Sequence, residues 1–288
     1  MHMLGSLRRR LGLPVSLGTA TALGATLMIA LPAGAQAADD RSPEGGVGVS
    51  EASVSQTLEN LDKVDGSLLI APAASAEAGP GDVDLGTGSV HVPTALEQGV
   101  TLTDESGQDV KISLPYAAQA GQAKVLDRGG VTYPGDQSAN SVIVGEVGVQ
   151  MITTISGVDS PTAYPYDLGL DSGQSIQLAD GGAEVVNADG SVAFVVAPAW
   201  AKDANGRDVP THFEVDGSVL TQVVDHPSAE NLAYPVVADP LVLPFWAIKC
   251  LAGLGLKSSD IIRIATLGSA NSIAAAFGRA AVACVTGK

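Results

Sequence analysis

Two cysteines and four histidines are the side chains of this 288-residue sequence best suited to covalent or metal chemistry. Cys250 and Cys284 lie 34 positions apart, too far for the paired cysteines of a zinc knuckle, and no His-x-x-x-His spacing occurs. In an exported protein, an even pair of cysteines in one short segment predicts a disulfide, with two buried free thiols as the alternative. Closing a loop of this length would stabilise the fold by about 4 kcal/mol if the gain comes from chain entropy.

A serine hydrolase is the enzyme class that the remaining residues suggest most readily. Asp225 and His226 are adjacent, and His212 shares a predicted strand face with Glu214. A catalytic triad is defined by geometry rather than by spacing, so a secreted hydrolase that uses His226 or His212 stays open as an alternative. However, no Gly-x-Ser-x-Gly sequence occurs, and Ser172 has the flanks of an ordinary turn. We therefore predict no catalytic residue, no cofactor and no metal ion, and lean against an enzyme.

Residues 203–208 read Asp-Ala-Asn-Gly-Arg-Asp and place several oxygen ligands on one tight turn, as calcium loops do. The glutamate and the full spacing of an EF-hand are missing, and Arg207 would repel a cation. A turn stabilised by its own Asp and Asn side chains is the simpler interpretation. The sequence leaves calcium binding at these residues undecided.

The net charge of −16 excludes one class of partner and divides the chain into two parts. A protein this acidic repels a phosphate backbone, so we predict no nucleic-acid binding. Residues 38–240 contain 7 basic and 30 acidic side chains, a net charge of −23, whereas residues 241–288 contain 5 basic side chains and Asp260, a net charge of +4. This shift predicts a module boundary near Asp239-Pro240.

Residues 1–37 have the three parts of a secretory signal peptide. Arg8 to Arg10 supply the positive region, residues 11–31 are apolar and uncharged, and Ala35-Gln36-Ala37 fits the cleavage pattern. We predict cleavage between Ala37 and Ala38 and a secreted or cell-envelope location, with an uncleaved anchor as the alternative. The arginine run leaves the general and the twin-arginine export routes open. No later apolar run reaches the roughly 20 residues of a membrane span.

The elements that must position these residues are mainly β-strands. Residues 38–89 are expected to be flexible, with one short helix over 50–64 and a linker over 70–89. From residue 90 apolar and polar residues alternate, and residues 100–103 and 110–114 predict a hairpin. Asp-Gly pairs at 180–181, 189–190 and 216–217 predict further tight turns. Residues 90–240 are therefore expected to form an antiparallel β-sandwich or partly open barrel.

Residues 241–288 lose this alternation and predict a small C-terminal helical module. We expect three short helices: one around 245–254, a second that is capped by Ser258 or Ser259 and ends at Gly268, and a third from Ser269 through Ala283. The aromatic and basic side chains of this module are the candidate interaction residues: Phe245, Trp246, Lys249, Arg263 and Arg279.

Three stretches carry a resemblance to known proteins: residues 197–206 (Ala-Pro-Ala-Trp-Ala-Lys-Asp-Ala-Asn-Gly), 220–226 (Leu-Thr-Gln-Val-Val-Asp-His) and 233–240 (Ala-Tyr-Pro-Val-Val-Ala-Asp-Pro). Over residues 91–240 the chain resembles a group of secreted actinobacterial proteins without an established biochemical role. It is also similar to the β-rich segments upstream of YD repeats in bacterial wall-associated toxins, although YD repeats themselves are absent. The resemblance implies a β domain, transfers no catalytic residue, and implies that the part after Asp239-Pro240 differs in function between members.

The same stretches have a physical interpretation. Pro235 restricts Tyr234 to an extended backbone at the end of the last strand. Trp200, one of two tryptophans, is expected to close one end of the β core. Asp239-Pro240 is expected to end the last strand and to lead the chain into the helical module.

Three functions compete at this point. The favoured one is a non-enzymatic exported protein of the bacterial cell exterior, whose β domain presents the helical module to an unknown protein or cell-envelope partner. The first alternative is an antibacterial or membrane-active effector with its activity in residues 241–288, which would contact the membrane peripherally through cationic, apolar helices. The second alternative is the secreted hydrolase described above.

Overall fold

The computed structural model describes residues 48–74, 76 and 79–288. These residues all belong to one compact unit, Glu44–Lys288. The predicted signal peptide and its cleavage site at Ala37 and Ala38 lie outside the described residues. Within them, helices occur near both ends of the described chain: α1 (Glu51–Val64), α2 (Phe245–Gly253), α3 (Ser258–Leu267), α4 (Ala270–Phe277) and α5 (Arg279–Thr286), with short 3-10 turns η2 (Leu96–Gln98) and η3 (Ala117–Gln119) between them.

The strands form three antiparallel sheets, which agrees with the predicted mainly β fold. One sheet has four strands in chain order: β1 (Gly81–Asp84), β2 (Gly88–Val92), β3 (Val100–Asp104) and β4 (Asp109–Ile112). Another has three strands in the order β14-β15-β9: β9 (Ala163–Asp167), β14 (Thr211–Asp216) and β15 (Val219–Val224).

The large sheet has ten strands, of which eight run in the order β10-β11-β12-β17-β8-β7-β6-β5. Its strands are β5 (Lys124–Val125), β6 (Val131–Tyr133), β7 (Ser138–Gly145), β8 (Gly148–Ile155), β10 (Ser175–Ala179), β11 (Gly182–Val186), β12 (Val192–Val196), β13 (Trp200–Lys202), β16 (Val236–Asp239) and β17 (Leu241–Leu243). The central strands β7 and β8 are buried along nearly their whole length.

This large sheet forks at Pro240. Strands β16 and β17 lie end to end along β8, and Pro240 separates them. Proline has no N–H to donate to a strand neighbour, so it interrupts the ladder there, while its carbonyl still accepts from the Met151 N–H at 3.0 Å. On their other edges β16 pairs with β13, and β17 pairs with β12. The chain between β12 and β13 therefore has to bridge two diverging branches of the sheet.

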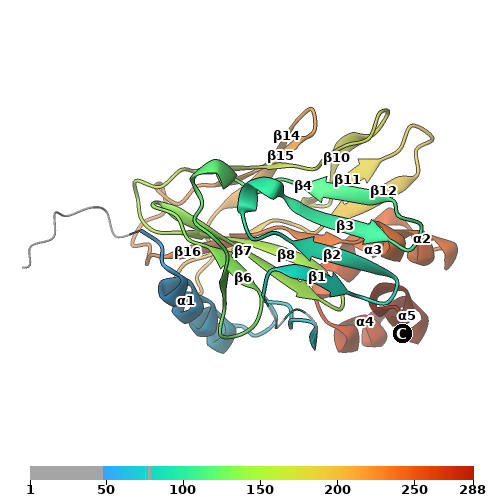
Figure 1. The fold of residues 1–288 in the computed structure, drawn as a ribbon, viewed down its shortest axis with the longest axis horizontal. Coiled ribbons are helices and arrows are strands. Elements are labelled where there is room, and N and C mark those ends of the chain that lie inside the picture. Colours follow the sequence, from blue (N-terminus) through green and yellow to red (C-terminus); the bar gives the residue numbers. More distant parts are fainter. Residues whose placement is uncertain (1–47, 75, 77–78) are drawn as a thin grey trace, which may run out of the picture. The chain divides into compact units, whose positions relative to one another are not determined.

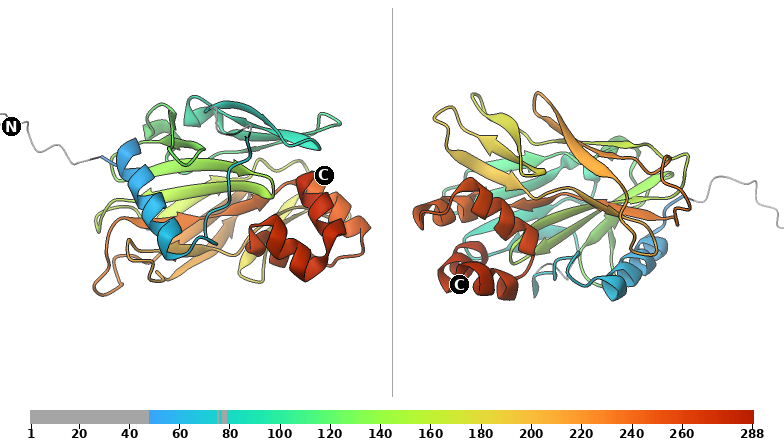
Figure 2. Two further views of the ribbon diagram at one scale, coloured as in Figure 1. Left: turned by 90° about the horizontal axis from the view of Figure 1, so that it is seen from below. Right: turned by 180° about the vertical axis from the view of Figure 1, so that it is seen from behind.

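The layers and helices enclose one hydrophobic core. The four-stranded sheet stacks on the large sheet, and α1 lies beside β6 (Figure 1). At the other end α2 and α3 pack on β12 and β17, and α4 and α5 complete the C-terminal helical cluster (Figure 2). Core residues come from every layer, including Leu58 of α1, Leu102 of β3, Ile152 of β8 and Ile262 of α3.

Most local predictions of the sequence are confirmed. The helix predicted over residues 50–64 is α1, which buries Val54, Leu58 and Leu61. The predicted hairpin is β3–β4. The three Asp-Gly pairs lie in the turns of β10–β11, β11–β12 and β14–β15, where Gly181, Gly190 and Gly217 all have positive φ.

Other predictions need correction. Residues 70–89 are not simply a linker, because they include β1 and the start of β2. The chain does not leave the sheet at Asp239-Pro240: residues 241–243 form β17, and the helices begin only at Phe245. There are four C-terminal helices rather than three, since Gly278 divides α4 from α5. The N-cap position of α3 is Lys257 rather than a serine, and its backbone N–H donates to the Asp260 side chain.

The predicted disulfide is confirmed. Cys250 of α2 is bonded to Cys284 of α5, with a Cα–Cα distance of 5.3 Å. The bond joins the first and last helices of the cluster, so α3 and α4 lie within the closed loop. The charge step at residue 240 thus precedes the change from strand to helix at Phe245, and both lie inside one compact unit.

Candidate functional site

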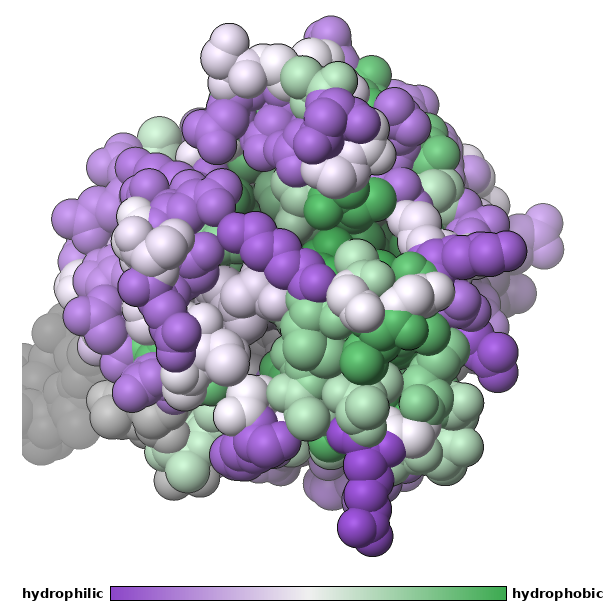
Figure 3. Space-filling model, turned by 90° about the vertical axis from the view of Figure 1, so that its right-hand side faces the viewer, coloured by the Kyte–Doolittle hydropathy of each residue, from purple (hydrophilic) through white to green (hydrophobic). Residues whose placement is uncertain are grey.

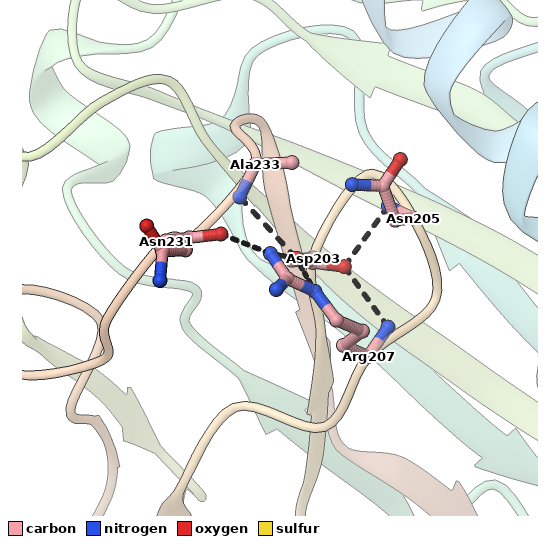
Figure 4. Close-up of polar contacts among 5 residues, drawn as sticks. All are labelled: Asp203, Asn205, Arg207, Asn231 and Ala233. Carbon is pink, nitrogen blue, oxygen red and sulfur yellow. Dashed lines mark hydrogen bonds and ion pairs between the residues drawn. The ribbon is translucent and has the colours of Figure 1, made fainter.

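The turn at Asp203 is a self-contained hydrogen-bonded structure, shown in Figure 4. Asp203 Oδ1 accepts hydrogen bonds from the backbone N–H groups of Asn205 and Arg207, each at 2.9 Å. Its Oδ2 accepts from Arg207 Nε at 2.8 Å and from the Ala233 N–H at 3.2 Å. Arg207 also donates to the Asn231 carbonyl, so the side chain ties the turn to the chain before β16.

These contacts decide the state and the role of the Asp203 carboxylate. Burial by itself raises the pKa of Asp203, but the hydrogen bonds from Arg207, Ala233 and Asn205 outweigh it and lower the pKa below its ordinary value. The side chain is fully shielded from solvent, and the Arg207 guanidinium pairs with Oδ2. The Asp-stabilised turn predicted from the sequence is therefore present, and a positive charge already sits where a calcium ion would bind.

His226 has both ring nitrogens engaged in the core. It is 1% exposed. Nε2 lies 3.0 Å from the Pro161 carbonyl and Nδ1 lies 2.7 Å from the Tyr234 hydroxyl. A carbonyl oxygen can only accept, so Nε2 carries a proton; in the neutral ring Nδ1 then accepts from the Tyr234 hydroxyl. Tyr234 precedes Pro235 through a cis peptide bond, and its ring packs edge-on against His226. This histidine joins two segments and leaves no free nitrogen for a serine.

The two other histidines that the structure describes lie on exposed strand surfaces. His212 Nε2 is 3.4 Å from Glu214 Oε1 on β14, the sheet-surface pair that the sequence suggests. His91 on β2 is 2.7 Å from Asp82 on β1. Ser172 lies exposed in the turn before β10. Within the part of the chain that the structure describes, no group of three or more His, Cys, Asp or Glu side chains could hold a metal ion.

The five candidate interaction residues of the tail divide into two groups. Phe245 and Trp246 are 3% and 8% exposed, so they belong to the core rather than to a contact surface, and their rings pack against each other. Lys249, Arg263 and Arg279 are exposed on α2, α3 and α5. Lys249 lies over the Phe245 ring and 3.5 Å from Asp104 of β3, while Arg263 lies over the ring of Phe277.

A cleft of about 370 Å³ lies where α2 and α3 meet the edges of the sheets. Its apolar walls come from Val110 of β4, Val192 of β12, and Ile248 and Ala252 of α2, and Lys249 lies at its rim. The amide side chains of Gln108, Gln174 and Asn187 also line it. Figure 3 faces this end of the compact unit: hydrophobic side chains gather over the helices, and a recess with hydrophobic surface lies beside them. Clefts of this size with apolar walls and a few polar groups are typical ligand sites.

The sequence pointed to only part of this cleft. Lys249 and Phe245 were marked by charge and aromatic character, and both line it. Val110 and Val192 carry no chemical signal in the sequence, because they are ordinary strand residues that line one cleft only after α2 has packed on β12. On α3, Ile261 also lines the cleft, and Ile261, Ile262 and Ile264 are each at most 2% exposed.

Comparison with protein-family models and with curated proteins found no match for this chain. None of the described helices has the length and apolar character needed to cross a membrane.

Proposed function

We propose that this protein is an exported, non-enzymatic binding protein of the bacterial cell exterior, and that the cleft beside α2 and α3 takes an apolar segment of an acidic envelope partner. The observation that carries the proposal is the cleft itself. Its walls are apolar, its volume is in the range of ligand sites, and it opens on the basic part of an otherwise acidic chain.

The charge distribution supports an acidic partner. Residues 241–288 carry a net charge of +4, and Lys249 at the rim is 60% exposed. An anionic partner would be attracted to this end and repelled by the rest of the chain, which would orient its approach.

The arrangement of the described histidines weighs against the hydrolase. His226 has no free ring nitrogen, and His212 and His91 pair with single carboxylates on exposed strands. A general base must lie within hydrogen-bond reach of the group that it activates. For these reasons we do not favour an enzyme.

The burial of the tail weighs against a membrane-active effector. Phe245, Trp246 and the three isoleucines of α3 face the core, and the disulfide holds α2 against α5. A surface-active helix needs its apolar face free to enter the membrane interface. Residues 241–288 would have to leave the sheet before they could supply such a face.

The test is cosedimentation of the mature chain, residues 38–288 with its disulfide formed, with isolated bacterial cell-wall and membrane fractions. Ala252→Arg fills the mouth of the cleft while adding positive charge, so we expect bound protein to fall about ten-fold for steric reasons. Ala275→Arg is the matched control, because Ala275 is an exposed alanine of α4 away from the cleft.

A second pair of variants separates charge from shape. Lys249→Met should weaken retention and its dependence on salt, whereas Lys124→Met on exposed β5 should leave both unchanged. Retention that is the same for Ala252→Arg and Ala275→Arg, or no retention of the unmodified chain, would contradict the proposal. A chain stopped at Pro240 is not a usable control, because it lacks β17 between β12 and β8.

A further inference from the structure

A second cavity lies at the fork of the large sheet. Its volume is about 340 Å³. Its base is formed where β16 gives way to β17 along β8, at Asp239, Leu241 and Gln150. The chain that bridges β12 and β13 forms one wall, and Thr266 near the end of α3 also lines the cavity. The cavity thus follows from the divergence of the two branches at Pro240.

The Asp239 carboxyl is the unusual group in this cavity. Asp239 is 1% exposed. Its Oδ2 accepts one hydrogen bond, from Gln150 Nε2 at 2.5 Å. Gln150 is itself fixed, because its Nε2 also contacts the Leu68 carbonyl and its Oε1 accepts from the Ile70 N–H. Among the described residues, Oδ1 of Asp239 has no hydrogen-bond partner.

A buried carboxyl with so few donors around it favours its neutral form. Burial raises the pKa of Asp239 well above its ordinary value, and the hydrogen bond from Gln150 only partly opposes this. Because Oδ2 is occupied by the Gln150 donor, the proton belongs on Oδ1. Asp239 then presents an O–H donor at the wall of the cavity.

The other walls are largely apolar, with Ser67 and Thr266 as further polar side chains and an ion pair at the mouth. Trp200 is half-buried and pairs through its backbone with Asp239, and Pro198 and Ala199 precede it along the wall. At the mouth, Lys202 Nζ lies 2.7 Å from Asp208 Oδ1. An indole wall suits the C–H face of a ring-shaped molecule, and a buried donor with an ion pair at the mouth suits hydroxyl groups around its rim. The cation of Lys202 disfavours a positively charged ligand.

We propose that the cavity at the sheet fork binds a neutral saccharide, with one sugar ring against Trp200 and a hydroxyl or N-acetyl oxygen accepting a hydrogen bond from Asp239. The site is separate from the cleft beside α2 and α3, so either proposal can fail without the other.

Tryptophan fluorescence tests the proposal in the full mature chain. The sequence has two tryptophans, and Trp246→Phe leaves Trp200 as the reporter. Titration of this variant with N-acetylglucosamine and with its β-1,4-linked disaccharide should give a saturable shift of the emission to shorter wavelengths. Asp239→Ala should weaken the apparent affinity about ten-fold, the effect of losing one good hydrogen bond. Asp239→Asn should retain most of it, because its oxygen can accept from Gln150 while its NH2 group donates into the cavity.

Two further variants protect the test against a folding defect. Thr266→Tyr blocks the mouth from an exposed position and should abolish the shift, whereas Ala275→Tyr on exposed α4 should not. Absence of a saturable shift with both saccharides would overturn the proposal, and so would a shift that survives both Asp239→Ala and Thr266→Tyr. Titration with choline is the remaining arm: binding of choline but not of saccharide, lost in Asp239→Asn, would show a cation site and would also overturn it.

Discussion

Two aspartates of this protein, Asp203 and Asp239, are equally buried and have opposite surroundings. Each is 1% exposed, and each lies in one of the distinctive stretches of the sequence. Asp203 accepts hydrogen bonds on both oxygens and pairs with Arg207, and its pKa is lowered. Asp239 accepts from Gln150 alone, and its pKa is raised well above the ordinary value.

The difference separates the carboxylate of Asp203, which holds a turn together, from the carboxyl group of Asp239, which has an oxygen left to bind a ligand. Burial penalises the charged form of both groups, and only the surrounding donors decide whether that penalty is offset. At Asp203 the turn supplies both donors to Oδ1, and Arg207 and the Ala233 N–H donate to Oδ2, so both oxygens are used in holding residues 203–207 together and to the Ala233 segment. At Asp239 the fork of the sheet removes neighbours instead of supplying them, and a cavity results. The comparison suggests four measurements.

The largest effect is expected from Asp203→Ala. The change leaves the Arg207 guanidinium and the backbone N–H groups of Asn205 and Ala233 without their acceptor, and we expect the free energy of unfolding to fall by about 3 kcal/mol. Urea denaturation at neutral pH measures it. Asp189→Ala is the control. Asp189 accepts hydrogen bonds from Ser191 alone, in an exposed turn, so this change should lower the free energy of unfolding clearly less than Asp203→Ala does. Equal decreases in the free energy of unfolding for the two variants would mean that the contacts of Asp203 with Arg207 do not stabilise the fold.

A smaller loss is expected from Arg207→Ala, about 1–2 kcal/mol, since Asp203 keeps its three backbone donors. The pKa of Asp203 is lowered in the folded state, so the stability that its ionisation supplies is present above the ordinary aspartate pKa of 3.8 and is lost as the pH falls through the lower folded value. The gap between Arg207→Ala and the unmodified chain should therefore narrow as the pH is lowered below 3.8. A difference in the free energy of unfolding that stays constant in acid would contradict the pairing of Arg207 with an ionised Asp203.

Asp239→Asn should raise the free energy of unfolding at neutral pH, whereas the changes at Asp203 and Arg207 lower it. Above the ordinary pKa of 3.8 the unfolded chain releases the Asp239 proton while the folded protein keeps it, so the unmodified protein loses stability as the pH rises through the raised folded value. Asparagine has no proton to lose. Unfolding curves at pH 3.5 and pH 7 should show a relative gain for Asp239→Asn only at the higher pH; a relative loss at pH 7 would place an ionised carboxylate in the core.

The smallest effect is expected at the mouth of the fork cavity. Lys202→Met removes an ion pair whose acidic partner, Asp208, is 87% exposed, and should cost about 0.5 kcal/mol. Thermal unfolding monitored by circular dichroism measures it. A loss as large as that of Asp203→Ala would make Lys202 part of the framework and weaken the distinction between the two aspartates.

The sequence predicted local structure wherever the residues of one short stretch are sufficient to determine its conformation. Asp-Gly pairs supply the positive φ of tight turns, and the spacing of Val54, Leu58 and Leu61 defines a helix face. Asp203 accepts from N–H groups that lie within the next four residues. An even pair of cysteines in a short segment likewise predicted the bond that the structure contains. In the turns and the helix the partners are close in sequence, so the pattern and the contact coincide; the two cysteines are 34 positions apart, and their pairing followed from their number rather than from their spacing.

What only the tertiary structure decided is where distant segments meet. The sequence marked Asp239-Pro240 as the end of the β region, whereas the missing proline N–H turns out to split one strand path along β8 into β16 and β17. Phe245 and Trp246 looked like contact residues, and the packing of α2 on the sheet buries them. The surroundings of Asp239 depend on residues 68–70, 150 and 200, and no local sequence pattern records that its hydrogen-bond donor, Gln150, lies 89 positions away. Hydrophobic burial is non-directional and depends on the apolar surface of the whole chain, so these contacts between distant segments cannot be read from any one short stretch.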